Sequence, residues 1–290
     1  MLQYCLSCFR HIRFLLTVCS LLLFCACAPP ASSIHANIEG YDLDHPVRVN
    51  LPTVLNEISG LWYYPKDKSL FAIIDETGYL YKVNPRKPDS IFRWKFAGYG
   101  DFEDLVLVGN TFFILESNGT IYATSIPNNE NIQTVKYSPP EKGNEYESLY
   151  YDETAGMLIL ICKDCKQDSK KSLSTLGFNV TTRQFVPAPF IMNASDIAGI
   201  VGEDKIKFKP SAATLNPFNG QLMMISAING LLVTASRTGE IIQAYPLNKK
   251  LYKQPEGIAI GADRTLYISN EWNKKGAANI MILPYRPQKK

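Results

Sequence analysis

The feature that most constrains this chain is a short phrase that recurs five times. Each phrase has an acidic or small residue, then another small or acidic residue, and then an apolar strand. The phrases begin at Ser59, Glu103, Glu147, Ser211 and Glu256, so the intervals between them are 44, 44, 64 and 45 residues. After each phrase comes a polar turn and a second apolar strand. Periods in the forties built from short strands and glycine-rich turns are typical of β-propeller blades.

The pattern predicts an all-β fold, a β-propeller of five four-stranded antiparallel blades rather than six. Helices are disfavoured, because apolar residues rarely recur at a 3.6-residue period and 18 Gly with 18 Pro interrupt the chain. An all-β sandwich is the competing class, but it does not explain the regular spacing. Residues 40–55 are expected to pair with the last blade and close the ring, which hides an open sheet edge. The long interval predicts an insertion of about 20 residues, with a helical turn at 193–201 capped by Ser195 or Asp196.

The first 26 residues have the features of an export signal. Arg10 and Arg13 precede an apolar run, 14–26, that is too short to span a membrane. The small Ala26 precedes Cys27, which predicts a bacterial lipoprotein with Cys27 lipidated; an ordinary cleaved signal peptide is the alternative. The predicted domains are therefore a signal peptide, 1–26, a tether, 27–44, and one propeller domain, 45–290. The protein is expected on the periplasm-facing side of the outer or inner membrane of the cell envelope.

Charge and cysteine content narrow the possible partners. Without the predicted leader, the formal net charge falls from +3 to +1, and no basic stripe is present, so nucleic acid is not an expected partner.

Four of the seven cysteines lie in the leader. Cys162 and Cys165 form a C-x-x-C sequence at the end of a predicted strand, where a structural role, oxidised to a disulfide or not, is favoured over a redox or zinc site.

Repeated acidic residues define a candidate site. In a hairpin, the end of the second strand returns to the height at which the first strand began. Acids at both places are therefore expected to gather at one mouth of the central channel. The candidate ligands are Glu57, Asp75, Glu103, Glu116, Glu147, Glu256 and Glu271.

Converging carboxylates repel one another unless a cation neutralises them, and oxygen donors suit Ca²⁺ or Mg²⁺. All three histidines lie in or near the leader, which argues against a histidine-based metal site or a histidine base. A second interpretation is that the acids cap strand ends or pair with Lys and Arg at a solvated rim. The sequence leaves both interpretations open.

Several phrases together resemble a known family. The closing pair, Gln254 to Ala259 and Leu266 to Glu271, together with Glu147-Ser148-Leu149, is similar to the SdiA-regulated (YjiK/CarP-like) propellers. The resemblance covers about residues 45–285. It implies an envelope-associated propeller with a suggested link to calcium, and it points to Glu57, Glu147, Glu256 and Glu271. Ser211 departs from the pattern, since it stands where an acid is expected.

These observations favour a binding or scaffold module that holds Ca²⁺ at the channel mouth and presents that face to an unknown ligand or protein. The alternative is a metal-dependent hydrolase of the phytase-like or lactonase-like kind, in which a metal would lower the pKa of a bound water. No nucleophile–base pair and no phosphate-binding glycine loop is present in the sequence, so no catalytic residue is assigned. A propeller whose acids have only a structural role is the third possibility.

Overall fold

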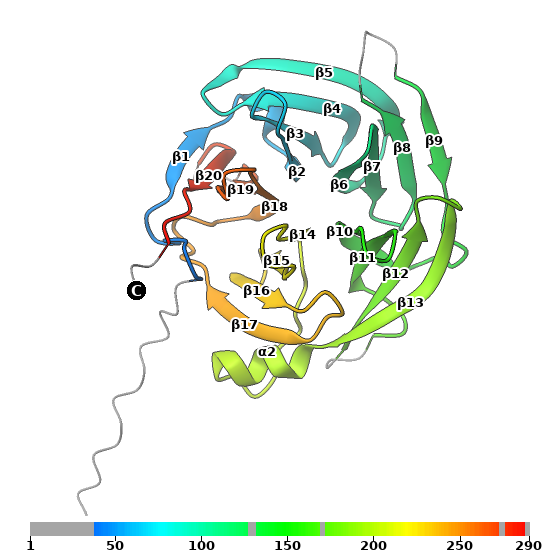
Figure 1. Ribbon diagram of the computed structural model, residues 1–290, viewed down its shortest axis with the longest axis vertical. Coiled ribbons are helices and arrows are strands. Elements are labelled where there is room, and N and C mark those ends of the chain that lie inside the picture. The colour runs from blue at the N-terminus through cyan, green and yellow to red at the C-terminus, as the bar shows by residue number, and fades with distance from the viewer. Residues whose placement is uncertain (1–37, 127–131, 169–171, 273–275, 288–290) are drawn as a thin grey trace, which may run out of the picture. The chain divides into compact units, whose positions relative to one another are not determined.

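Five antiparallel sheets of four strands each account for the strands in the described part of the chain. The computed structural model describes residues 38–126, 132–168, 172–272 and 276–287, and all of these fall within one compact unit. Figure 1 shows the sheets arranged as blades around a central axis. Contacts join the innermost strands in the order β2, β6, β10, β14, β18 and back to β2. The predicted five-bladed propeller is confirmed.

Within blades 1 to 4, the chain runs from the innermost strand outward. Blade 1 comprises β2 (Ile58–Tyr64), β3 (Ser69–Ile74), β4 (Thr77–Asn84) and β5 (Lys87–Tyr99). Blade 2 comprises β6 (Phe102–Val108), β7 (Thr111–Glu116), β8 (Ile121–Ser125) and β9 (Thr134–Tyr137). Blade 3 comprises β10 (Glu145–Asp152), β11 (Met157–Asp164), β12 (Ser172–Asn179) and β13 (Gln184–Asn193). Blade 4 comprises β14 (Ala212–Leu215), β15 (Leu222–Ser226), β16 (Leu231–Ala235) and β17 (Ile241–Pro246).

Blade 5 is shared between the two ends of the described chain. Its strands are β18 (Pro255–Ile260), β19 (Leu266–Asn270), β20 (Asn279–Leu283) and, outermost, β1 (Val47–Asn50). The register pairs Val47 with Ile282 and Asn50 with Asn279. A short 3₁₀ turn, Thr53–Leu55, leads from β1 toward blade 1. The predicted closure of the ring by residues 40–55 is confirmed, and it joins the two ends of the propeller in one sheet (Figure 1).

Residues 38–44, which the sequence assigned to a tether, pack against blades 4 and 5. The side chains of Ile38, Tyr41 and Leu43 are buried in a cluster with residues of β15, β16, β19 and β20. The Tyr252 hydroxyl donates a hydrogen bond of 2.9 Å to the Leu43 carbonyl. This stretch therefore adds apolar surface to the propeller core.

Burial falls sharply at the outermost strand of a blade, which explains why the three inner strands are the easier ones to predict. All five residues of β15 and of β16 are buried, whereas β17 has one fully buried residue. The inner strands are flanked on both faces by neighbouring blades, so their sequences are nearly continuous apolar runs. The outer strands have one solvated face, and their mixed composition gives a weaker signal.

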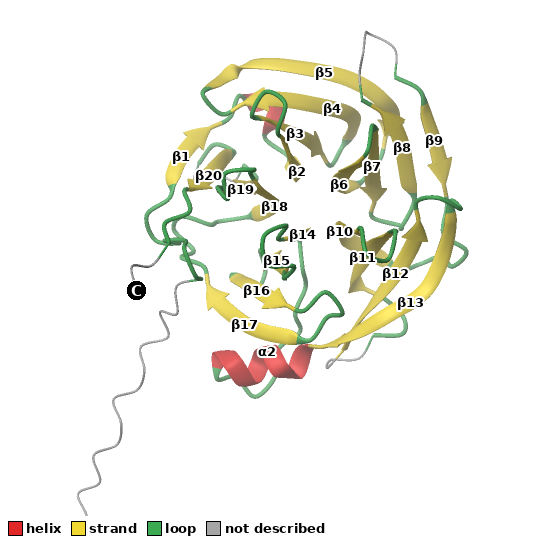
Figure 2. Cartoon of the chain, viewed as in Figure 1, coloured by secondary structure: helices red, strands yellow, loops and turns green. Residues whose placement is uncertain are grey.

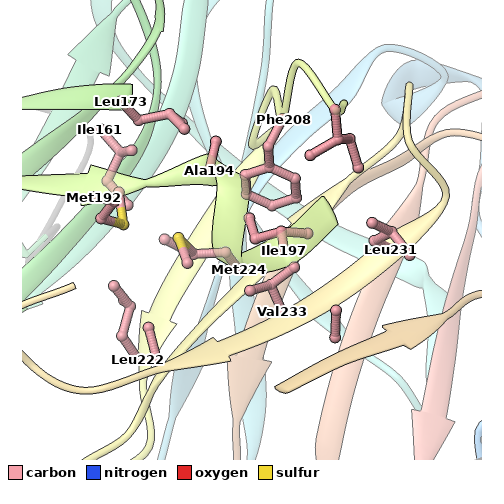
Figure 3. Close-up of a cluster of buried hydrophobic side chains, with 14 of the residues drawn as sticks. Ile161, Leu173, Met192, Ala194, Ile197, Phe208, Leu222, Met224, Leu231 and Val233 are labelled. Carbon is pink, nitrogen blue, oxygen red and sulfur yellow. The ribbon is translucent and has the colours of Figure 1, made fainter. Parts of the chain in front are cut away.

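The insertion in the long interval carries the helix α2 (Ala194–Val201), which lies outside β17 (Figure 2). The helical turn was predicted, but its cap is Asn193, not Ser195 or Asp196. The Asn193 side chain accepts a hydrogen bond from the Ser195 N–H at 3.1 Å. Figure 3 shows Ile197 of this helix close to Phe208 and to residues of β15 and β16 in one buried cluster. The insertion therefore covers the outer face of the gap between blades 3 and 4.

The predicted signal peptide, 1–26, and Cys27 lie outside the described residues. Within the described ranges, no helix has both the length and the apolar character needed to cross a membrane. Export and lipidation therefore stay predictions from the sequence.

Candidate functional site at the channel mouth

The recurring phrase forms a β-bulge at the start of the innermost strand. In blade 2 the β6–β7 register skips Glu103, in blade 3 the β10–β11 register skips Glu147, and in blade 5 the β18–β19 register skips Glu256. A bulge leaves one residue unpaired and re-aims its side chain. The same irregularity at the same height in three blades turns three glutamates toward the channel mouth.

A cavity of about 350 Å³ occupies this mouth, and acidic side chains dominate its lining. Among the described residues that line it, Lys163 is the one basic side chain. Other lining residues are Ile58, Ser59, Ser117 and Gln254. The acidic lining residues are Glu57, Asp75, Asp101, Glu103, Glu145, Glu147, Glu256 and Glu271.

Six of the seven acids proposed from the sequence line this cavity, and Glu116 does not. Glu116 is the last residue of β7, and its carboxylate accepts a hydrogen bond from the Tyr122 hydroxyl at 3.1 Å. The Lys136 ammonium lies 3.6 Å from the same carboxylate oxygen. The side chain is thus held against the neighbouring strands of its own blade, away from the channel.

Sequence reasoning missed Asp101 and Glu145. Each lies two residues before a bulge glutamate, and alternate residues of an extended chain project to the same side. The same offset gives Glu57 in blade 1 and Gln254 in blade 5, and both line the cavity. Applying this alternation to each phrase would have found the missing acids.

Lys163 makes an ion pair with Glu147 across the first two strands of blade 3. This lysine lies between Cys162 and Cys165, which form a disulfide. The next residue, Asp164, points to different partners, because Lys207 and Lys209 lie within 3.3 and 3.1 Å of its carboxylate. Within the disulfide loop, the Lys163 ammonium therefore lies at the mouth, whereas the Asp164 carboxylate pairs with lysines outside the mouth lining.

The mouth carboxylates hold protons more tightly than ordinary acids do. Burial, reinforced by the negative charge of Asp101, raises the pKa of Glu103 to about 9. Burial also raises the pKa of Glu256 to about 7, although the Lys163 charge opposes the shift. For Asp75, burial and the charge of Glu57 raise the pKa to about 6. Near neutral pH the cavity thus contains protonated carboxyl groups, and a cation could displace their protons.

Two further carboxylates share a hydrogen bond. Burial raises the pKa of Glu271, and a side-chain hydrogen bond with Glu57 raises it further. The Gln254 side-chain amide also donates to the Glu271 carboxylate. The Glu271 carboxyl group therefore has hydrogen-bond partners in two other mouth residues, Glu57 and Gln254.

One carboxylate oxygen at the mouth is without a partner. Asp75 Oδ1 is buried and has no hydrogen bond among the described residues. In the described ranges, no three mouth carboxylates have ligand oxygens within 4.8 Å of one another. The group of side chains that meets this distance is Cys162, Cys165 and Asp168, and the two cysteine sulfurs in it are bonded to each other. A bound ion would therefore take few protein oxygens and complete its shell with water.

Directly below the mouth, Asp104 joins three blades. Its carboxylate accepts hydrogen bonds from the backbone N–H of Leu105 and of Leu149, both at 2.8 Å, and also from that of Ala213. These acceptor contacts reach from β6 to β10 and β14. Burial raises the pKa of Asp104 well above its usual range, while the three N–H groups act in the opposite direction. Asp104 is buried and ties the innermost strands of blades 2, 3 and 4 together.

Small residues at the second position of the phrase have a geometric reason. A Cβ on Gly60 would lie 2.6 Å from the Asp104 Cα, and one on Gly257 would lie 2.8 Å from the Ser59 carbonyl. The serines of the phrase link blades: Ser59 donates to the Glu103 carbonyl and Ser211 to the Pro255 carbonyl, both at 2.6 Å. Ser211 is buried and stands where the phrases of blades 2, 3 and 5 have a glutamate. Its hydroxyl therefore contributes a contact between blades instead of a carboxylate at the mouth.

Removing the disulfide should cost moderate stability. Substituting both Cys162→Ala and Cys165→Ala is expected to lower the free energy of unfolding by about 2 kcal/mol, because a very short loop is no longer closed in the unfolded chain. Thermal denaturation should show a midpoint lower by about 5 °C. Dithiothreitol should bring the wild type to the same midpoint and leave the variant unchanged. Equal midpoints for wild type and variant without reductant would contradict a structural role.

Comparison with known proteins agrees with this architecture. A family model described as SdiA-regulated matches residues 37–164. No curated protein matches the chain. Glutaminyl cyclase of Myxococcus xanthus has a similar structure, with a TM-score of 0.59 and 12% identity over 84% of this chain and 97% of that one. A glucose dehydrogenase has a TM-score of 0.52 and 10% identity over 84% of this chain and 100% of that one.

At these identities, the likeness to solved structures shows the fold alone. The family match is more informative, because it covers blades 1 and 2 and the first two strands of blade 3. This part includes the bulge acids Glu103 and Glu147. The resemblance read from the sequence is thereby confirmed over residues 37–164, where this chain matches the SdiA-regulated family model.

Proposed function

We propose that this protein is an envelope-anchored binding module that holds a divalent cation, Ca²⁺, in the acidic cavity at the channel mouth. The anchor would be the lipid on Cys27, and the propeller would present its mouth to a ligand or a protein partner. The observation that carries the proposal is the set of eight carboxylates and one ammonium around a single cavity.

The donor chemistry fits a hard cation. Ca²⁺ prefers oxygen ligands and accepts water in its shell, so it can bind although the mouth carboxylates are not close enough for three of them to contact one ion in this structure. Glu103, Glu256 and Asp75 are the residues we expect to hold it. Their charges act on one another, since Asp75 contributes to the raised pKa of both glutamates. The unpartnered Oδ1 of Asp75 supports the same assignment.

Lys163 would limit the affinity. Its ammonium pairs with Glu147 and stabilises the ionised forms of Glu103 and Glu256, so it supplies part of the positive charge that an ion would bring. The same pairing is the reason to prefer binding over hydrolysis. A phosphate hydrolase would need this cation for its substrate, and here it is engaged by a carboxylate.

The double substitution Glu103→Gln with Glu256→Gln tests the proposal. Titration calorimetry at pH 8 should detect Ca²⁺ binding to the wild type and at least 10-fold weaker binding to the variant. The variant should also be more stable than the wild type in EDTA at pH 8, because neutral amides avoid the cost of burying charge. Weaker Ca²⁺ binding together with higher stability would show a role in binding, because damage to the fold would lower both.

Glu116→Gln is the matched control, since Glu116 is a glutamate at a strand end that the cavity excludes. Its Ca²⁺ affinity should equal that of the wild type. If the wild type gives no heat with Ca²⁺, or if Glu116→Gln weakens binding as much as the double variant does, the cavity is not the ion site.

A further inference from the structure

A second cavity, of about 260 Å³, lies at the opposite end of the central channel. Its floor is formed by residues two positions beyond the first residue of the phrase in four blades, namely Leu61, Leu105, Ala213 and Ile258. Along the innermost strands of blades 1, 2 and 5, the second residue of the phrase comes between a floor residue and the position that lines the acidic mouth. The two cavities share no lining residue and are therefore separate sites.

The walls of this cavity are aromatic and apolar. Trp62, Tyr151 and Phe218 line it, together with Val106 and Leu215. Trp62 and Tyr151 are partly exposed, and 42% of Phe218 is exposed, so aromatic surface in the cavity is accessible to a ligand. A concave apolar pocket with a few oriented polar groups is the usual form of a small-molecule site.

Arg237 gives this cavity its charge. Its Nη1 donates hydrogen bonds of 2.8 Å to Asp152 and to Thr154. Within the described residues, the hydrogen bonds and ion pair of this guanidinium all use Nη1. Its Nη2 lies 3.2 Å from the position that a Cβ on Gly220 would occupy, and Gly220 also lines the cavity. The guanidinium is thus held at one nitrogen and directs further donors toward the pocket.

The single carboxylate in the described lining, Glu153, is exposed to solvent and is therefore screened. Arg237, by contrast, is fixed beside the buried carboxylate of Asp152, which orients it without filling its remaining donors. A planar guanidinium with free donors matches a carboxylate in a two-point contact.

We propose that this cavity binds a small organic acid with an aromatic or short apolar body. The carboxylate would accept hydrogen bonds from the free donors of Arg237, and the body would lie among Trp62, Tyr151 and the apolar floor. This site is independent of the acidic mouth, so it does not rest on the cation-binding proposal.

The test uses the full chain and three probes: 4-phenylbutyrate, its neutral amide and 4-phenylbutylamine. Calorimetry should show that the acid binds at least 10-fold more tightly than the amide and that the amine does not bind measurably. Arg237→Lys keeps a positive charge beside Asp152 but loses the planar fork, so it should weaken binding of the acid about 10-fold. The Glu103→Gln, Glu256→Gln variant should bind the acid as the wild type does.

Arg93→Lys is the matched control, because Arg93 lies on the outer strand β5 and stacks over Tyr79, 5.0 Å from its ring centre, and neither residue lines this cavity. It should retain the wild-type affinity for the acid. Equal affinities for the acid and the amide, no binding of any probe, or equal losses in the two arginine variants would each overturn the proposal. The comparison of acid with amide needs no variant, so it holds even if Arg237→Lys is unstable.

Discussion

Substitution of Asp104 by Ala is expected to lower the free energy of unfolding by about 4 kcal/mol and the thermal midpoint by about 10 °C. The carboxylate satisfies backbone N–H groups of three innermost strands, from β6, β10 and β14. Its removal would leave these donors buried without an acceptor, and such groups cost about 1–3 kcal/mol each. Denaturant or thermal unfolding, followed by far-ultraviolet circular dichroism, measures the loss.

Ser148→Ala is the control for this prediction. Ser148 occupies the equivalent position one blade further on, and its buried hydroxyl has no hydrogen-bond partner among the described residues. Its removal should change the free energy of unfolding by less than about 0.5 kcal/mol, because no donor or acceptor is left unsatisfied. Similar losses for Asp104→Ala and Ser148→Ala would show that Asp104 does not join the blades.

The second large effect is a dependence of stability on pH that calcium reverses. In EDTA, the thermal midpoint should fall by about 5–10 °C between pH 5.5 and 8.5. Addition of Ca²⁺ should restore the loss at pH 8.5 and have little effect at pH 5.5. Differential scanning calorimetry at the two pH values, with and without the ion, measures all four midpoints.

The sign follows from the raised pKa values. The pKa of Glu103 is about 9 in the folded chain, against an ordinary value of 4.5, and that of Glu256 is about 7. Between the unfolded and folded pKa values, the folded chain holds protons that the unfolded chain has lost, so stability decreases as pH rises through this window. A cation that replaces those protons removes the penalty, and it competes best where protons are scarce.

A matched test of this sign is available in the double variant. With Gln at positions 103 and 256, the midpoint in EDTA should lose most of its dependence on pH between 5.5 and 8.5, and Ca²⁺ should no longer raise it. Should the wild type instead become more stable as pH rises without the ion, the mouth acids would be ionised and paired in the folded chain. That outcome would remove the basis for ion binding.

The blades could be predicted from the sequence because the physical signal is local. Apolar runs such as that of β15 are buried on both faces, and turn residues separate them at a nearly constant period. The closing strand β1 could be predicted because an unpaired edge is unfavourable. Outer strands such as β9 and β13 gave no such signal, since they mix polar and apolar residues.

The site could be predicted only in part, because the direction in which each acidic side chain points depends on the register of its strand. Glu116 was expected at the mouth from the hairpin geometry, yet Tyr122 and Lys136 hold its carboxylate within blade 2. Asp101 was overlooked, although it lies two residues before Glu103 on the same side of the extended chain. The role of Asp104 depends on contacts between blades, which no sequence period reveals.

The most direct measurement of the central claim is a crystal structure of the full chain grown at pH 8 with Ca²⁺. We expect an ion in the mouth cavity, with oxygens of Glu103, Glu256 or Asp75 at about 2.3–2.6 Å and water completing its shell. A well-ordered cavity that contains only water at saturating calcium, with these side chains in their present contacts, would contradict it.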